Sequence, residues 1–193
     1  MDFKLRGKVI FFATNNVHKF DEVRSVLVKY GIAVGMLRVK AVEIQNEHLS
    51  KIAEESTRDA FSRCHLPLIV EDAGLFVEAL NGFPGPYAAY VYKTLGNAGL
   101  LKLMENVANR KAKFQSAIAY FDGVEPVLFE GEAHGEIAFE EKKKNAKSAF
   151  GFDPVFKPLD DKRTFAQMTT EEKNSFSHRA TAIRKFAMWY KSA

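Results

Sequence analysis

The sequence has little of what marks several classes of protein. Its single cysteine, Cys64, excludes an internal disulfide pair and a zinc cluster built on cysteines, and it favours a reducing compartment. No apolar run is long enough to span a membrane, and the first residues lack the apolar region of a signal peptide. The composition also excludes collagen, a coiled coil and a disordered tail. We therefore expect a cytoplasmic protein with no membrane partner.

What is present is the composition of a globular protein. Hydrophobic residues make up 47% of the 193 residues and charged residues 27%, and Phe occurs 17 times, so we expect an aromatic-rich core. The length fits a single domain, residues 1–193, with two lobes and no separable linker. The formal net charge of +4 suits a polyanionic partner of any size and is weak evidence for nucleic acid.

Apolar runs and helical patterns alternate along the first part of the chain. The run Val9–Ala13 is typical of a buried strand, and the helix after it meets Gly31, a residue suited to a helix C-cap. The predicted order is strands at 9–13, 33–42 and 66–70 and helices at 17–30 and 50–64. This alternation predicts a layered α/β core with some parallel pairing.

The second part of the chain adds an antiparallel hairpin. The predicted elements are a helical region that ends near 106, strands at 112–121 and 126–139, and a last helix that ends at 191. The turn Asp122-Gly123 joins the two strands. The last helix begins at Thr170 or restarts near Ser177.

The segment between the first strand and the first helix is a candidate anion site. Thr14, Asn15 and Asn16 precede the helix, and Lys19 stands one turn into it. Backbone N–H groups and the positive end of the helix dipole favour an anion at such a junction, and Asn16 is a suitable N-cap. Neither a Walker lysine loop nor a dinucleotide glycine fingerprint is present. From this pattern alone, an ordinary capped helix start is the more common explanation.

Acidic residues follow the second and third predicted strands. Glu43 and Glu47 come after the second strand, and Glu71-Asp72 ends the third. If the strands are parallel, their carboxyl ends open on the same sheet edge as the Thr14 loop, where open α/β sheets bind ligands. Carboxylates beside phosphates fit Mg²⁺, which takes oxygen ligands from both. The alternatives are solvated loop positions and, for Asp72, an ordinary turn residue.

An aromatic segment, Phe150-Gly151-Phe152-Asp153, is a candidate for contact with a base. An exposed Phe stacks well on a nucleobase, and such a stack contributes about 1–3 kcal/mol. In a chain this rich in Phe, a hydrophobic plug under a loop is the more common role for either ring.

Basic residues near the start of the last helix form a further candidate. Lys173, His178 and Arg179 donate hydrogen bonds to anions or carbonyls, and Ser177 is able to cap a restarted helix. Thr169 and Glu172 have the spacing of a capping box. A solvated helix face is the alternative explanation.

Five motifs occur in a fixed order over nearly the whole chain. They are Ala13-Thr14-Asn15-Asn16-x-x-Lys19, Val70-Glu71-Asp72-Ala73-Gly74-Leu75, Leu80-x-Gly82-x-Pro84-Gly85-Pro86-Tyr87, Phe150-Gly151-Phe152-Asp153-Pro154-x-Phe156 and Glu172-Lys173-Asn174-x-x-Ser177-His178-Arg179-Ala180. This arrangement resembles the inosine triphosphate pyrophosphatase family, which acts on non-canonical purine nucleotides. One motif alone is weak evidence, and all five in this order are specific.

The resemblance implies a fold, a reaction and an assembly. The implied fold is an elongated mixed sheet with helices on both sides and an active-site cleft between two lobes. The implied reaction is the Mg²⁺-dependent hydrolysis of ITP, dITP or XTP to the monophosphate and pyrophosphate, carried out by a homodimer.

The resemblance also implies roles for single residues. Glu43 and Asp72 would bind the metal, and Asp72 is the candidate general base. The purine would stack on Phe152. The implied substrate-binding residues are Thr14, Asn15, Asn16, Lys19, Ala73, Phe150, Gly151, Phe152, Asp153, Lys173, His178 and Arg179.

Four segments depart from the family pattern. Asn15 stands where glycine is usual, and asparagine tolerates a left-handed backbone. Ala73 replaces a serine and keeps its backbone N–H. Ser56 replaces a lysine of the second helix, and residues 88–90 replace a basic or Ser-Arg contact. We therefore expect no phosphate contact from Ser56 or from 88–90.

Three other functions remain open on the sequence. One is a related pyrophosphatase for pyrimidine or modified nucleotides, such as a Maf-like enzyme. Another is a nucleotide sensor that does not hydrolyse its ligand. The third is a nucleic-acid-binding module, but no basic stripe with interleaved aromatic residues supports it, so we expect no stable nucleic-acid partner. The acidic pair favours the enzyme.

Overall fold

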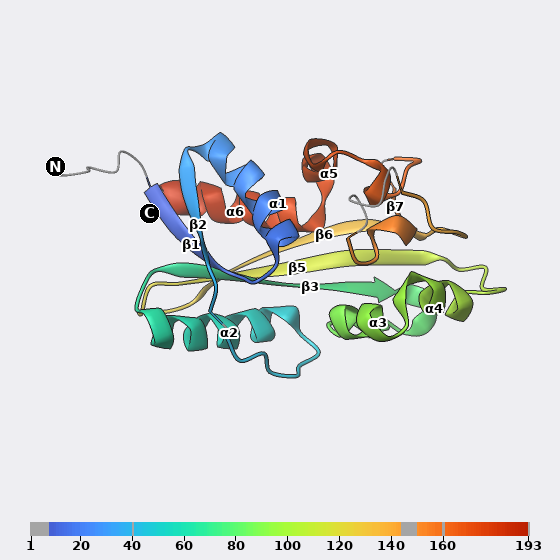
Figure 1. Ribbon diagram of the computed structural model, residues 1–193, viewed down its shortest axis with the longest axis horizontal. Helices are drawn as coiled ribbons and strands as arrows, with labels where there is room; N and C mark the ends of the chain where they lie inside the picture. The colour runs from blue at the N-terminus through green and yellow to red at the C-terminus, as the bar shows by residue number, and fades with distance from the viewer. Residues whose placement is uncertain (1–7, 40, 144–149, 160, 193) are drawn as a thin grey trace.

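The protein is a mixed α/β structure, which confirms the predicted fold class. The computed structural model describes residues 8–39, 41–143, 150–159 and 161–192. Within these residues one seven-stranded sheet has the order β2-β1-β3-β5-β6-β7, and β4 pairs with β3 (Figure 1). The strands are β1 (Lys8–Ala13), β2 (Ile32–Leu37), β3 (Leu68–Val77), β4 (Pro84–Gly85), β5 (Lys111–Phe121), β6 (Val127–Ile137) and β7 (Phe156–Pro158).

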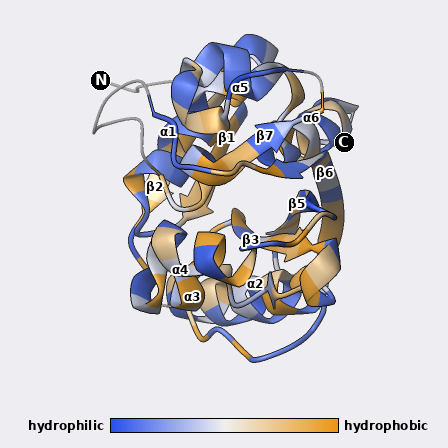
Figure 2. Ribbon diagram, turned by 90° about the vertical axis from the view of Figure 1, so that its right-hand side faces the viewer, coloured by the Kyte–Doolittle hydropathy of each residue, from blue (hydrophilic) through white to orange (hydrophobic). Residues whose placement is uncertain are grey.

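Helices cover both faces of the sheet. They are α1 (Val17–Leu27), α2 (Leu49–Cys64), α3 (Ala88–Thr94), α4 (Gly96–Leu103), α5 (Thr170–Phe176) and α6 (His178–Ser192). Figures 1 and 2 show α1, α5 and α6 on one side of the strands and α2, α3 and α4 on the other. Among the described residues, none of these helices combines the length and apolar composition that a membrane span requires.

Local sequence signals set several of the element boundaries. Asn16 caps α1, and Gly31 adopts the left-handed conformation (φ 71°) after a short 3-10 turn that extends α1 to Tyr30. Thr169 and Glu172 form the expected capping box at the start of α5. A new helix, α6, begins directly after Ser177, as the second interpretation of this region predicted.

The predicted end of the third strand, Val70, is wrong. β3 is longer, and its length decides where the acidic pair Glu71-Asp72 lies. β3 continues to Val77 because β5 pairs with it antiparallel over its whole length. On the other side, the last pair between β1 and β3 is Phe12 with Ile69. Glu71 and Asp72 therefore lie within a strand, at the level where β1 has already ended. β2 is shorter than predicted because its partner β1 also stops, at the pair of Ala13 with Leu37.

The core divides into two main clusters along the long strands. One cluster contains Ile69 and Ile118 with residues of β1, α1 and α6. The other contains Leu75 and Phe114 with residues of α3, α4 and the segment around Phe156. Glu71 and the β5 residue that donates a hydrogen bond to it, Ser116, are buried between these clusters along the strands. Buried polar groups need partners, so this stretch of the sheet is where a functional site is expected.

Candidate active site

The loop between β1 and α1 is fixed by its own side chains. The N–H of Asn16 donates to Thr14 Oγ1 (3.1 Å), and the N–H of Lys19 donates to Asn16 Oδ1 (3.2 Å). The N–H of Thr14 donates to the carbonyl of Leu37 on β2 (3.1 Å). The first turn of α1 therefore presents its remaining N–H groups, and the exposed Asn15, at the end of the sheet.

Lys19 reaches from α1 to β3. Its Nζ lies 2.9 Å from Glu71 Oε2 and donates to the backbone carbonyl of Glu71 (3.3 Å). Its side chain is 20% exposed, so the ammonium group lies at the border between the buried carboxylate and solvent. The lysine predicted to hold phosphates thus contacts the residue directly before Asp72, and its charge acts to lower the pKa of Asp72.

Glu71 is a buried carboxylate with three side-chain partners. Besides Lys19, it accepts from Ser116 Oγ (2.7 Å) and from Arg179 Nε (2.9 Å). Burial alone would raise the pKa of Glu71, but the charges of Arg179 and Lys19 and these hydrogen bonds hold it well below its usual range. Glu71 is therefore ionised, and it fixes two cations that lie on different helices.

A second buried carboxylate, Glu22 on α1, holds the cations of the C-terminal segment. Its oxygens pair with Lys173 Nζ (2.7 Å) and with the Arg179 guanidinium. Burial would raise the pKa of Glu22, but Lys173 and Arg179 lower it to about 2. Lys173 also pairs with Asp153 (2.6 Å).

The side chains just described form one buried ion network of three carboxylates and three cations. Its members are Lys19, Glu22, Glu71, Asp153, Lys173 and Arg179. Sequence reasoning found Lys19, Asp153, Lys173 and Arg179, pointed to Glu71 without a role for it, and missed Glu22. The available signal was that Glu22 stands three residues after Lys19, beside the inward-facing Val23.

His178 is buried and neutral. It is 2% exposed, and its ring stacks on Phe114 with centroids 4.7 Å apart and planes 11° apart. Burial, and then the charges of Arg179 and Lys173, hold its pKa well below the usual range. Its Nδ1 is buried and has no hydrogen-bond partner among the described residues, which makes His178 a candidate contact for a ligand.

The two rings of the aromatic segment have different surroundings. Phe152 is 3% exposed and packs in the core, with its ring edge-on to Tyr92 (5.5 Å), so it lacks the open face that stacking on a base requires. Gly151, with φ 53°, separates it from Phe150. The Phe150 ring is half-buried, 5.2 Å from the His18 ring and 5.8 Å from Lys173 Nζ.

Asp72 has a different electrostatic environment from Glu71. Burial raises its pKa to about 6, and the negative charges of Glu71 and Glu43 add to the shift, against Lys19 and a hydrogen bond from the N–H of Ala73. Glu43 is exposed in the segment after β2, and Glu47 is exposed at the end of the same segment. Asp72 is therefore a carboxylate poised to take up a proton or a cation near neutral pH.

The donor set at Asp72 fits Mg²⁺. Asp72 and Glu43 are hard oxygen ligands whose repulsion a cation would relieve, and Mg²⁺ is usually held by one or two carboxylates plus phosphates and water. No group of three or more His, Cys, Asp or Glu side chains gathers into a metal site in the part of the chain that the structure describes. Asp72 and Glu43 would therefore hold the ion together with water, and nucleotide phosphates would add further oxygen ligands.

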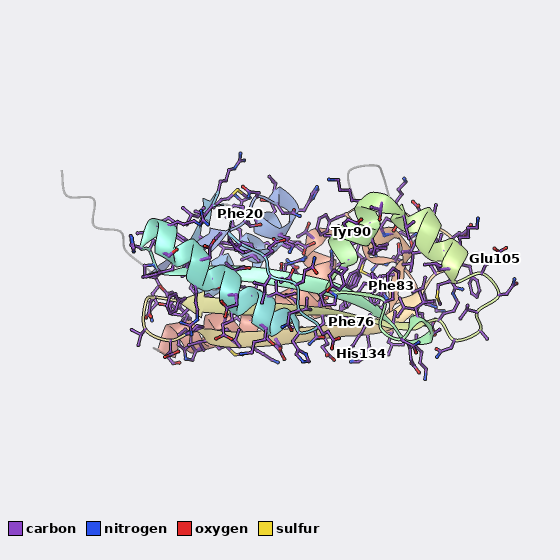
Figure 3. All side chains as sticks on the ribbon, turned by 90° about the horizontal axis from the view of Figure 1, so that it is seen from below. Phe20, Phe76, Phe83, Tyr90, Glu105 and His134 are labelled. Carbon is purple, nitrogen blue, oxygen red and sulfur yellow. The ribbon has the colours of Figure 1, made fainter. Side chains whose placement is uncertain are left out.

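Two departures from the family pattern lie on the α2 and α3 side of the molecule. Ser56 Oγ donates to the carbonyl of Val42 (2.9 Å), so its hydroxyl is engaged in a hydrogen bond within the protein. On α3, Ala88 is buried while Ala89 and Tyr90 are exposed, and Figure 3 labels Tyr90 on this helix.

The chain is similar to known proteins over nearly its whole length. The model of the Ham1 family matches residues 10–189. A dITP/XTP pyrophosphatase of Thermococcus kodakarensis is 48% identical over 180 residues, which cover 93% of this chain and 96% of the relative. A dITP/XTP pyrophosphatase of Methanopyrus kandleri is 46% identical over 184 residues, which cover 95% of this chain and 96% of the relative.

Solved structures agree with this assignment. A HAM1 protein from Coxiella burnetii superposes with a TM-score of 0.82 at 28% identity, covering 96% of this chain and all of that chain (100%). The Ham1 protein of Staphylococcus aureus gives a TM-score of 0.81 at 28% identity, and the match covers 96% of this chain and 99% of that chain. The sequence motifs, the fold and these relatives lead to one conclusion: the chain belongs to the Ham1 family.

Proposed function

We propose that this protein is a nucleoside triphosphate pyrophosphatase that converts non-canonical purine nucleotides (ITP, dITP and XTP) to the monophosphate and pyrophosphate. The curated relatives at 46–48% identity are dITP/XTP pyrophosphatases. The observation that carries the proposal is the contact of Lys19, in the first turn of α1, with Glu71 (2.9 Å), the residue directly before Asp72 on β3, whose own pKa is raised to about 6 by burial. An acid–base group next to an anion site is the arrangement that phosphoanhydride hydrolysis needs.

Different residues bind the phosphates, accept the proton and hold the metal. The N–H groups of the α1 first turn and Lys19 bind the phosphates, and Thr14 and Asn16 keep that turn in place. Asp72 accepts the proton of a water that attacks the α-phosphorus in line. Glu43 and Asp72 would hold Mg²⁺, which when bound would supply charge neutralisation and lower the pKa of coordinated water.

Base selectivity follows from donors and acceptors. Hypoxanthine and xanthine carry a 6-oxo acceptor, whereas adenine presents a 6-amino donor. A pocket of donors from His178, Arg179 and backbone N–H groups leaves ATP with a donor facing a donor, and such mismatches discriminate by about 10⁴-fold or more. Exclusion of GTP, which shares the 6-oxo group, requires a clash with its 2-amino group. We assign base stacking to Phe150 because its ring is accessible and the Phe152 ring is not.

The family resemblance extends the proposal to a homodimer in the cytoplasm. The net charge of +4 is spread over a chain without a basic stripe, so the nucleotide, and not a nucleic acid, is the proposed partner. Light scattering at micromolar concentration measures the assembly directly, and a mass near 21.7 kDa would contradict the dimer.

The first test is pyrophosphate release from ITP, XTP, dITP, GTP, ATP and pyrimidine triphosphates, with Mg²⁺ and with EDTA. We expect metal-dependent release from ITP, XTP and dITP. Release mainly from a pyrimidine nucleotide would favour the Maf-like alternative. Binding of ITP without release, by a folded protein, would favour a sensor and contradict the role of Asp72.

A further inference from the structure

The segment that carries Glu43 is tied to α2 through one residue, Val42. Its carbonyl accepts from Ser56 Oγ (2.9 Å), and its N–H donates to Asp59 Oδ2 (2.8 Å). Both backbone groups of a residue outside any helix or strand are therefore bound by side chains of α2. We call Ser56, Asp59 and the partner of Asp59, Arg63, the α2 clamp.

Arg63 completes the clamp on the helix surface. Its Nε and one terminal nitrogen donate to the two carboxylate oxygens of Asp59 (3.0 and 3.1 Å), in a two-pronged pair one helical turn apart. Hydrogen bonds from Arg63 and from the N–H of Val42 lower the pKa of Asp59. Asp59 is thus an ionised acceptor held in one orientation, although its side chain is 25% exposed.

The bond from Ser56 acts directly on the backbone of Glu43. The carbonyl of Val42 and the N–H and Cα of Glu43 share one planar peptide unit. Fixing that carbonyl oxygen therefore restricts the position of the Glu43 Cα, from which the carboxylate extends. Glu43 is itself exposed, so burial does little to hold its side chain in place.

α2 in turn rests on the strands that carry the rest of the site. Ala53 and Ala60 are wholly buried on its inner face, and Thr57 Oγ1 donates to the carbonyl of Ala119 on β5 (3.4 Å). β5 pairs with β3 at Asp72 through Ala117. The clamp therefore ties the Glu43 segment to α2, which packs against both β5 and β3, the strand that carries Asp72. The negative charge of Glu43 also contributes to the raised pKa of Asp72.

We propose that Ser56 and Asp59 are positioning residues that hold Glu43 opposite Asp72 for a divalent cation. This inference rests on the proposed metal-dependent function and goes beyond it. It also gives Ser56 a role in place of the phosphate contact that the family's lysine would make: the hydroxyl orders the ligand loop. Residues that orient metal ligands typically change metal affinity by about 10–100-fold when removed.

The test is Mn²⁺ binding to the full chain without nucleotide, measured by the loss of the free Mn²⁺ signal in electron paramagnetic resonance. We expect Asp59→Asn and Ser56→Val to raise the Mn²⁺ dissociation constant about tenfold. Threonine has the same shape as valine but keeps a hydroxyl, so the Mn²⁺ dissociation constant of Ser56→Thr should stay within about threefold of the wild-type value. Glu54→Gln removes the same charge from α2 as Asp59→Asn, yet Glu54 pairs only with Lys51 and Arg58 among the described residues, so it is the matched control.

Activity provides a second readout. The clamp variants should need more Mg²⁺ for half-maximal pyrophosphate release, with kcat largely restored at saturating Mg²⁺, whereas general damage would lower kcat at every Mg²⁺ concentration. Unchanged Mn²⁺ affinity in folded Asp59→Asn and Ser56→Val, or equal weakening by Ser56→Thr and Ser56→Val, would overturn the inference, as would absence of Mn²⁺ binding by the wild type. Failure of the wild type to release pyrophosphate from any nucleotide would instead contradict the proposed function.

Discussion

Removal of the Glu22 carboxylate should destabilise the protein far more than the loss of a surface charge. Glu22 is 8% exposed and pairs with Lys173 and Arg179, so Glu22→Gln leaves three buried cations facing two carboxylates. Breaking a buried ion pair by removing one partner costs about 3–5 kcal/mol, because the remaining charge stays desolvated. For a chain of this size, each kcal/mol lowers Tm by about 2–4 °C, so the expected decrease is about 6–20 °C.

The single tryptophan provides the assay for this prediction. Trp189 packs against Tyr120 and Phe129 in the core cluster next to the network, so its fluorescence reports thermal or urea unfolding. Glu54→Gln, which breaks partly exposed pairs, should change the free energy of unfolding by at most about 1 kcal/mol. If Glu22→Gln is as stable as Glu54→Gln, the reasoning from charge balance is refuted.

Four further predictions follow from single residues. Asp72→Asn should lower kcat at least about 100-fold and change nucleotide affinity by only a few-fold, in steady-state kinetics and calorimetry; wild-type turnover would contradict the role of base. Because Asp72 must be ionised to act and burial raises its pKa to about 6 in the metal-free protein, kcat/KM at limiting Mg²⁺ should fall as pH decreases below about 6, and saturating Mg²⁺ should move the inflection to lower pH; an inflection that persists in Asp72→Asn would assign it to another group. Glu22, whose pKa is lowered from 4.5 to about 2, contributes stability that is complete above 4.5 and is lost as pH falls toward 2, so urea unfolding at pH 5 and pH 3 should differ more in the wild type than in Glu22→Gln. Phe150→Ala should raise KM for ITP with little change in stability, whereas Phe152→Ala should cost about 3–5 kcal/mol of stability; the reverse pattern would return the stacking role to Phe152.

Short-range patterns made much of the fold predictable. The apolar run that forms β1, the Asn16 cap, the Gly31 stop and the capping box of Thr169 depend only on neighbours in the chain, and each is found where the sequence placed it. These signals are local because hydrogen bonds to nearby backbone groups and a 3.6- or 2-residue period decide them.

The sequence by itself determined the family, the fold class and the set of residues gathered at the site, because motif order and local periodicity are properties of the chain alone. Only the tertiary structure decided which partners those residues contact and how deeply each is buried. β3 runs past Val70 because β5, distant in sequence, supplies its hydrogen-bond partners. Glu22 became part of the site because α1 packs against α6 and brings it to Arg179. Burial by long-range packing likewise placed Phe152 in the core and left Phe150 accessible, a difference that no local pattern of the two rings contains.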